Sequence, residues 1–166
     1  MWRRRRDKPA ASEPADIFGD LRTQVLTLDP RTADFEPSPE HPRVWGALME
    51  MGMDVGVASL VGLVDGSTSL YLSSGGGMIG GGEHEAIADA TRRFLGVLEE
   101  HLDELSPDTD SELPGDHEVD IRALTYDGRL SARAVDDDLA EERHPLSPVF
   151  YAGQDVITLL RQASPD

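Results

Sequence analysis

The chain has 166 residues, no cysteine and a formal net charge of −17 at pH 7. This length fits one folded domain with tails, and the absence of cysteine excludes disulfides, thiolate metal sites and cysteine nucleophiles. The acidic balance argues against nucleic acid as a partner, because phosphate binding requires a basic face. The lack of cysteine and of an apolar run of signal-peptide length predicts a cytoplasmic protein.

A basic segment opens the chain. Residues 1–14 join Arg3, Arg4, Arg5 and Arg6 to a polar, proline-containing stretch that cannot form a core, which predicts a disordered basic tail. The alternative is a weak electrostatic contact between these four arginines and an anionic membrane.

Residues 15–41 are predicted to form an N-terminal helix and a proline-rich linker. Ile17, Phe18, Leu21 and Val25 recur at helical spacing, and the helix is expected to end before Pro30. Prolines among acidic residues then indicate an extended connection.

Residues 42–163 are predicted to form a single α/β domain, which begins with a second helix. Pro42 suits the first position of a helix and Gly52 suits the position after its end. The apolar face of this helix would consist of Val44, Trp45, Leu48 and Met49.

A first hairpin follows. The segment 55–64 is dense in valine and leucine and predicts a strand that is apolar on both faces, while 67–73 alternates polar and apolar residues. Asp65-Gly66 predicts a two-residue turn between the two strands. Such a turn sets a register in which Leu63 opposes Thr68.

Six glycines lie between Gly75 and Gly82 and formally match the G-x-G-x-x-G dinucleotide motif. The context does not fit, because the preceding strand belongs to a hairpin and no acidic residue ends a second strand about 20 residues further on. We therefore expect a turned connection. The alternative is that Met78 and Ile79 at its centre are exposed as a small apolar tip for a partner.

The clearest helix in the sequence spans residues 83–105. Its apolar stripe consists of Ile87, Thr91, Phe94, Leu95, Leu98, Leu102 and Leu105. An acidic loop is expected at 106–117.

A second hairpin is predicted from strands at 118–126 and 129–135 around Asp127-Gly128. On its polar face Arg122 would oppose Arg133, an unfavourable pair unless a carboxylate such as Asp120 or an anion lies between them. A solvated acidic turn at 136–142 then leads to a last helix that opens at Ser147-Pro148.

Motifs for catalysis are incomplete. His84-Glu85 begins an H-E-x-x-H zinc motif, but residue 88 is alanine, and no G-x-S-x-G or P-loop is present. We expect no catalytic residue, no cofactor and no metal site.

The order of helices and hairpins over about residues 42–163 resembles the roadblock and longin group, in which a sheet packs between helices and dimers form by edge or helix contact. Three segments also resemble, in their amino-acid sequence, small acidic proteins of actinobacteria: Arg43 to Ile79, Leu124 to Gly128 and His144 to Pro148. This likeness implies no activity.

Two functional hypotheses remain. The first is a non-catalytic protein-interaction or scaffolding domain that forms a homodimer. The strand that is apolar on both faces and the aromatic last helix offer more hydrophobic surface than a small monomer covers. The second is a binder of a small anionic ligand, or an enzyme, that uses the glycine stretch Gly75–Gly82 with Arg122 and Arg133. The candidate interaction residues are Tyr71, Gly77, Met78, Ile79, Arg122, Arg133, Phe150 and Tyr151.

Overall fold

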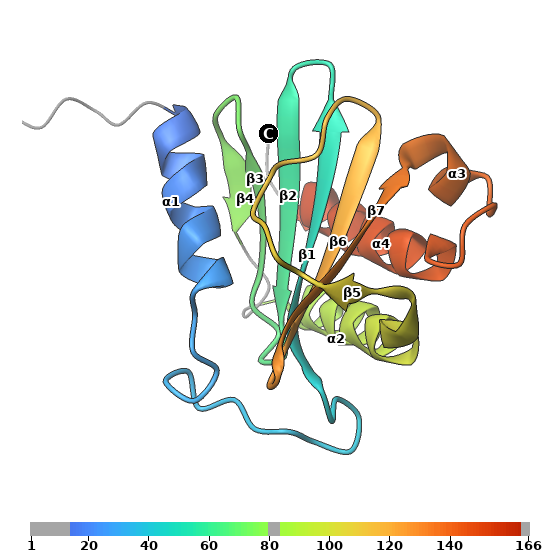
Figure 1. Ribbon diagram of the computed structural model, residues 1–166. Helices are drawn as coiled ribbons and strands as arrows, with labels where there is room; N and C mark the ends of the chain where they lie inside the picture. Colours follow the sequence, from blue (N-terminus) through green and yellow to red (C-terminus); the bar gives the residue numbers. More distant parts are fainter. Residues whose placement is uncertain (1–13, 80–83, 164–166) are drawn as a thin grey trace, which may run out of the picture.

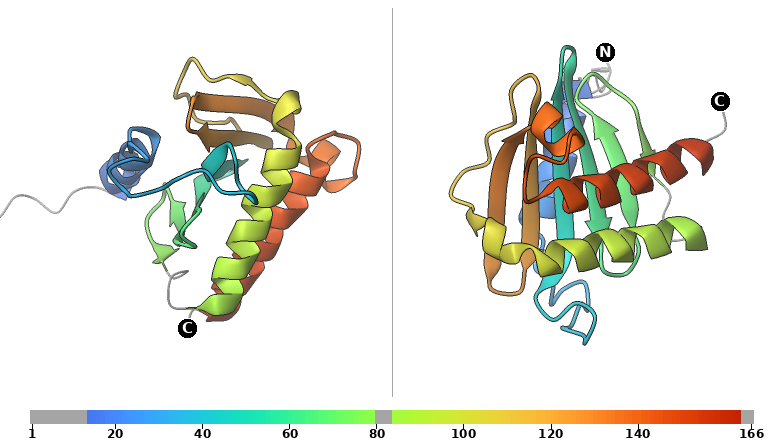
Figure 2. Two further views of the ribbon diagram at one scale, coloured as in Figure 1. Left: turned by 90° about the horizontal axis from the view of Figure 1, so that it is seen from below. Right: turned by 90° about the vertical axis from the view of Figure 1, so that its right-hand side faces the viewer.

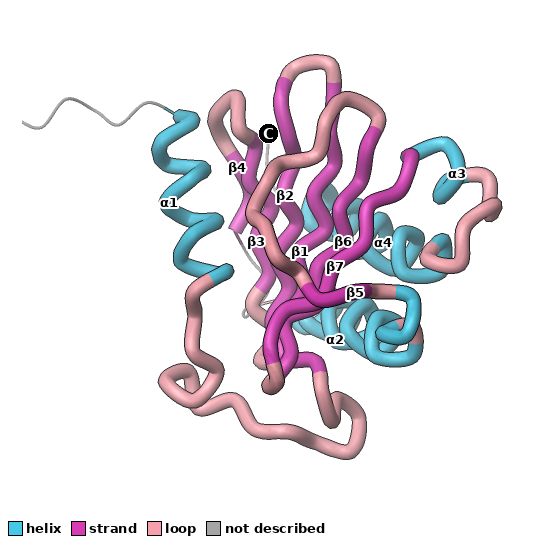
Figure 3. Tube along the Cα trace, viewed as in Figure 1, coloured by secondary structure: helices cyan, strands magenta, loops and turns pink. Residues whose placement is uncertain are grey.

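Seven strands form one antiparallel sheet in the order β4-β3-β2-β1-β6-β7-β5 (Figures 1 and 3). This computed structural model describes residues 14–79 and 84–163. It confirms the mixed α/β class predicted from the sequence, as an α+β arrangement. The elements in chain order are α1 (Pro14–Leu26), β1 (Val44–Met53), β2 (Gly56–Leu63), β3 (Thr68–Leu72), β4 (Gly77–Ile79), α2 (Glu85–Glu100), the short 3-10 helix η1 (Leu102–Glu104), β5 (Ser106–Pro107), β6 (Glu118–Thr125), β7 (Gly128–Val135), α3 (Asp136–Ala140) and α4 (Ser147–Ala163).

The two faces of the sheet are covered differently. Helices α2 and α4 lie side by side across one face, and α1 lies on the opposite side (Figure 2). The acidic loop between β5 and β6 crosses the same face as α1 (Figure 1). The central strands are therefore enclosed from both sides.

The main core lies between the sheet and the pair α2 and α4. The predicted stripe of α2 is buried along its whole length, and Phe94, Leu95 and Leu98 have no exposed surface. Helix α4 begins at Ser147 as predicted and contributes buried Phe150, while Tyr151 is 42% exposed. Apolar burial of this extent is the principal stabilising term of a small domain.

The helix predicted for residues 42–52 is wrong, because this segment forms β1 at the centre of the sheet. Ala47 and Met49 face α2 and α4, whereas Trp45 and Leu48 belong to the cluster on the α1 side. A strand that is buried on both faces carries a continuous apolar run, and such a run does not distinguish a strand from a buried helix.

Both predicted hairpins are present, each with a register that differs from the prediction. Gly62, not Leu63, pairs with Thr68, because the turn holds three residues and Gly66 adopts a φ of 92°. In the second hairpin Thr125 pairs with Gly128, so Arg122 opposes Ser131 and Arg133 opposes Asp120. The predicted opposition of the two arginines is therefore wrong.

The glycine stretch forms a turn and a short strand rather than only a connection. Gly75 and Gly76 have φ values of 116° and 84°, which side chains rarely adopt, and they return the chain so that β4 pairs with β3. Residues 80–83 and residues 1–13 of the basic tail predicted at 1–14 lie outside the described residues, and Pro14 is the first residue of α1. The segment 136–142, predicted as a turn, instead contains helix α3.

Candidate functional site

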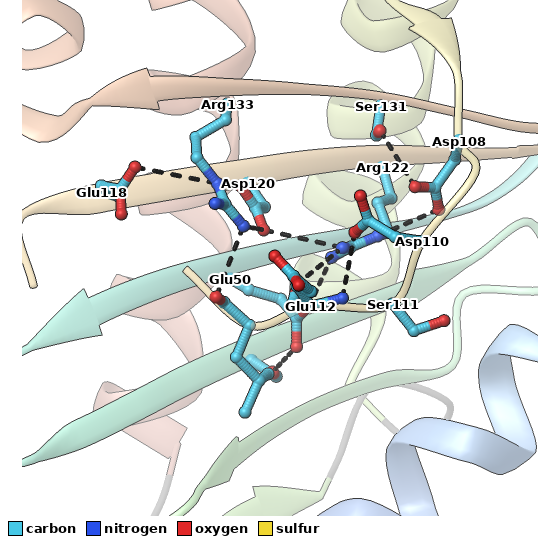
Figure 4. Close-up of polar contacts among 12 residues, drawn as sticks. Glu50, Asp108, Asp110, Ser111, Glu112, Glu118, Asp120, Arg122, Ser131 and Arg133 are labelled. Atoms are coloured by element: carbon cyan, nitrogen blue, oxygen red, sulfur yellow. Dashed lines mark hydrogen bonds and ion pairs between the residues drawn. The ribbon is translucent and has the colours of Figure 1, made fainter. Parts of the chain in front are cut away.

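A cluster of charged side chains is buried on the face of the sheet that α1 covers (Figure 4). Glu50 of β1 has no exposed surface, and Asp120 and Arg122 of β6 are 3% and 2% exposed. These three residues lie on neighbouring strands, where Glu50 pairs with Asp120 and Leu48 with Arg122. Buried charges of this kind are stable only when each one is paired and hydrogen-bonded.

Arg122 is the centre of the cluster. Its Nη1 donates to Glu50 at 2.6 Å, its Nε donates to Asp108 at 3.1 Å, and its Nη2 donates to the carbonyl of Glu112 at 3.0 Å. Asp120 Oδ2 lies a further 3.6 Å from Nη2. Every guanidinium nitrogen of Arg122 is therefore occupied, and the acidic loop is attached to the sheet through this residue.

Glu50 joins this cluster to α1. Arg22 of α1 approaches the carboxylate as a fork, with its Nε 2.9 Å from Oε2 and its Nη2 2.9 Å from Oε1. Ser59 of β2 donates to the same carboxylate. The remaining nitrogen of Arg22 donates to the carbonyl of Ser111 at 2.7 Å. Two arginines and a hydroxyl thus share one buried carboxylate, and together they offset the cost of keeping this charge away from water.

Arg133 of β7 completes the network at its edge. It forms two hydrogen bonds to Asp120, at 2.7 and 2.9 Å, and its Nε lies 3.8 Å from Glu118. The hydrogen bond to Asp120 raises the pKa of the Arg133 guanidinium. A carboxylate between the two arginines was the expected solution, and Asp120 is that carboxylate.

A small apolar cluster lies beside the charges, beneath the C-terminal half of α1. Trp45, Leu48, Val61 and Leu124 form it, with partly buried side chains of α1 and of the following connection packed against them. Phe35 of the connection lies against Trp45, with ring centroids 6.0 Å apart. The first helix is therefore held by one forked ion pair and a limited apolar contact.

Helix α1 fits this surface imperfectly. A cavity of about 540 Å³ lies on one side of it, lined in part by Arg22, Leu26 and Trp45. A smaller one of about 120 Å³ lies on the other side, between Phe18 and Tyr71. The indole N–H of Trp45 and the hydroxyl of Tyr126 are buried without a hydrogen-bond partner among the described residues. A buried polar group without a partner costs about 1–3 kcal/mol.

The structure distributes the predicted interaction residues over four places. Tyr71 lines the smaller cavity beside α1, and Arg122 and Arg133 belong to the charged cluster. Phe150 is buried and Tyr151 is exposed on α4. Gly77, Met78 and Ile79 lie on the edge strand β4, where Met78 packs half-buried against the main core. The side chain of Ile79 lies outside the described residues.

The glycine stretch and the two arginines do not meet. Strands β3, β2 and β1 separate β4 from β6, a distance of about 20 Å at the usual strand spacing. Both guanidinium groups are also already paired with carboxylates. The arrangement therefore does not provide the anion clamp that the second hypothesis requires.

The sequence did not point to Arg22 or Glu50 as site residues, and Trp45 was predicted on the apolar face of a helix. Two signals point to them. Glu50 is an acidic residue at the end of an apolar run. Arg22 follows Phe18 by four positions, which places Phe18 and Arg22 on one face of α1.

One exposed group of possible metal ligands occurs among the described residues. Ligand atoms of Asp54, Asp116 and His117 lie within 4.8 Å of one another. The hydrogen bond that the ring of His117 donates to Asp136, and the charges of Asp116, Asp136 and Asp54, raise the pKa of His117. In a chain this acidic, exposed carboxylates gather without a metal ion, so this group supports no assignment.

Comparison with protein-family models, with curated proteins and with solved structures finds no match to this chain. The resemblance of the element order to the roadblock and longin group therefore stays a prediction. Within the described residues, no helix has the length and apolar character that crossing a bilayer requires.

Proposed function

We propose that this chain is a non-catalytic protein-interaction domain that binds a helix on the face of the sheet now covered by α1. The observation that carries the proposal is the forked pair between Arg22 and Glu50. The fully buried carboxylate of Glu50, in the sheet, accepts these hydrogen bonds from Arg22, which belongs to the separate helix α1. Recognition of an amphipathic helix in a groove uses such anchors at helical spacing.

Helix α1 can leave this face without breaking the sheet. Backbone hydrogen bonds of the connection that follows it are local, as between the N–H of Phe35 and the carbonyl of Pro30. The residues that hold α1 are side chains, chiefly buried Phe18 and the Arg22 guanidinium. The two flanking cavities mean that an incoming helix with larger side chains would bury more apolar surface than α1 does.

The first partner that we propose is a second copy of the chain. The two-faced apolar strand that suggested a homodimer is covered within one chain, by α1 on one side and by α2 on the other. A dimer through this face therefore requires exchange of α1 between the copies. The α1 of a second copy carries the same Phe18 and Arg22, and the connection from residue 27 to residue 43 gives it reach.

A disulfide tests this exchange, because the chain has no cysteine of its own. Leu21 of α1 and Tyr71 of β3 line the same small cavity, so the pair Leu21→Cys and Tyr71→Cys is placed to cross-link α1 to the sheet. The protein is oxidised either dilute or concentrated, and the products are separated on a non-reducing gel and by light scattering. We expect a locked monomer from the dilute sample and a covalent dimer from the concentrated one.

The control is a variant with Leu21→Cys alone, which reports random contact between copies. A covalent dimer that forms equally in this control would contradict exchange of α1. A native chain that remains monomeric at about 100 μM would contradict the homodimer.

A further inference from the structure

The acidic loop between β5 and β6, residues 108–117, is attached to the rest of the molecule through its backbone. The carbonyls of three consecutive residues, 111–113, each accept a hydrogen bond from a different arginine. The donors, in the order of the carbonyls, are Arg22 of α1 at 2.7 Å, Arg122 of β6 at 3.0 Å and Arg133 of β7 at 3.4 Å. Two of these arginines belong to the sheet and the third belongs to α1, so the loop joins the helix to the sheet.

The guanidinium of Arg22 contacts β1 and the loop at the same time. Its Nε and Nη2 each lie 2.9 Å from an oxygen of Glu50, and its Nη1 donates to the carbonyl of Ser111. Because the guanidinium is planar and rigid, these nitrogens cannot be reoriented one by one. The side chain is only 11% exposed, and in such surroundings hydrogen bonds are stronger than in water. When α1 leaves the sheet, the loop therefore loses its contact at Ser111 in the same movement.

Glu50 supplies a second connection between α1 and the loop. Its Oε1 accepts from Nη2 of Arg22 at 2.9 Å and from Nη1 of Arg122 at 2.6 Å. Arg122 in turn donates to Asp108 at 3.1 Å and to the carbonyl of Glu112 at 3.0 Å. Withdrawal of Arg22 thus changes the charge around the carboxylate that orients Arg122, and members of such a network affect one another.

We infer that α1 and the acidic loop open as one unit, so that the loop acts as a strap that keeps α1 on the sheet. The coupling is reciprocal, because a change that weakens docking of one element weakens docking of the other by the same factor. A molecule that binds either element therefore changes access to the surface beneath the other. The inference concerns a single chain and does not rest on the proposed exchange of α1.

Two reporters follow the two elements in the full chain. Trp45 is 4% exposed beneath α1, and Trp2→Phe makes it the single tryptophan, so acrylamide quenching of its fluorescence reports undocking of α1. Pro114 is buried in the loop, and Pro114→Cys introduces the single thiol of the chain, so the rate of thiol labelling reports opening of the loop. Cleavage after Glu112 by a glutamate-specific protease measures the same opening in a chain that keeps Pro114.

The first set of variants perturbs α1. Phe18 lines the cavity on the β3 side of α1, whereas Ser111 of the loop lines the cavity on the other side. We expect Phe18→Ala to raise the labelling rate at position 114 by about fivefold or more. In a chain that already carries Arg22→Gln, Phe18→Ala should raise this rate by less than about twofold, because the connection is broken. Gln24→Ala, an exposed change on α1, is the control and should leave the rate unchanged.

Labelling and cleavage that stay unchanged in Phe18→Ala would overturn the inference. So would an equal effect of Phe18→Ala with and without Arg22, because the loop would then respond to α1 by another route.

The second set perturbs the loop. Gly52→Ala places a methyl group against the carbonyl oxygen of Gly115 and moves the loop away from β1. We expect the acrylamide quenching constant of Trp45 to rise by about twofold or more. Gly153→Ala adds the same group on the α2 and α4 face and should leave quenching unchanged. Faster labelling of the loop in Gly52→Ala without a change at Trp45 would show that the two elements open independently.

Discussion

The two faces of the sheet are stabilised by different interactions. On the α2 and α4 face, apolar side chains interdigitate without exposed surface around Phe94. On the α1 face, a buried ionic cluster and a small apolar cluster lie next to two cavities. The first arrangement is insensitive to the exact partner of each side chain, and the second is satisfied only by particular partners.

This difference separates stability from adaptability. Apolar burial is non-directional and scales with area, so the face beneath α2 and α4 fixes the fold. The forked contact to Glu50 depends on a particular partner, so a helix that displaces α1 keeps this contact only if it presents a cation in place of Arg22. The α1 face is therefore the part of the molecule on which a binding function can depend.

Two buried phenylalanines compare the faces most directly. Phe94→Ala removes a fully buried ring from the main core, and we expect the free energy of unfolding to fall by about 4 kcal/mol. Phe18→Ala removes a ring from α1, and we expect a loss of about 2 kcal/mol, limited to undocking of the helix. Urea unfolding measures the first change, and hydrogen exchange of α1 amides measures the second. Equal global losses would contradict the comparison.

Arg122→Gln tests the ionic cluster. The change leaves Glu50, Asp108 and Asp120 without their shared cation, and we expect a loss of about 3 kcal/mol in the free energy of unfolding. Arg143→Gln is the matched control, because Arg143 pairs with exposed carboxylates and should change stability by less than about 1 kcal/mol. A cost for Arg122→Gln no larger than that of the control would show that the cluster adds nothing to stability.

Two glycines report how each face responds to a single added methyl group. At Gly52 a Cβ would lie 1.7 Å from the carbonyl oxygen of Gly115, a backbone atom of the loop on the α1 side. At Gly153 it would meet the flexible end of Met49 at 2.5 Å. We expect Gly52→Ala to cost about 2 kcal/mol and Gly153→Ala to cost about 1 kcal/mol in thermal unfolding. The reverse order would mean that the loop yields more easily than the core.

The sequence predicted the elements better than the site. Alternation and turn residues located both hairpins, and the 3.6-residue period located α2 and α4, because these signals are local. β1 was missed because its two apolar faces are covered by helices that are distant in the sequence. A local pattern carries no information about such cover.

The charged cluster was not predicted from the sequence, for a related reason. Its residues come from α1, β1, β6, β7 and the acidic loop, and their meeting depends on strand order and register. A shift of two residues in the predicted second hairpin set Arg133 against Arg122 instead of Asp120. Among many carboxylates in an acidic chain, only the register identifies which one is buried.

The smallest expected effect concerns His117, at the exposed end of the loop on the α1 side. Asp136 raises the pKa of His117 above its usual value of about 6.5, so protonation is favoured in the folded state. Its contribution to stability is therefore fully present below that value and is lost as the pH rises through the raised pKa. His117→Asn keeps a residue type that tolerates the φ of 61° but removes the charge. The difference in Tm between the native chain and this variant should shrink from about pH 5.5 to about pH 9. A difference independent of pH would assign the role of His117 to its backbone conformation.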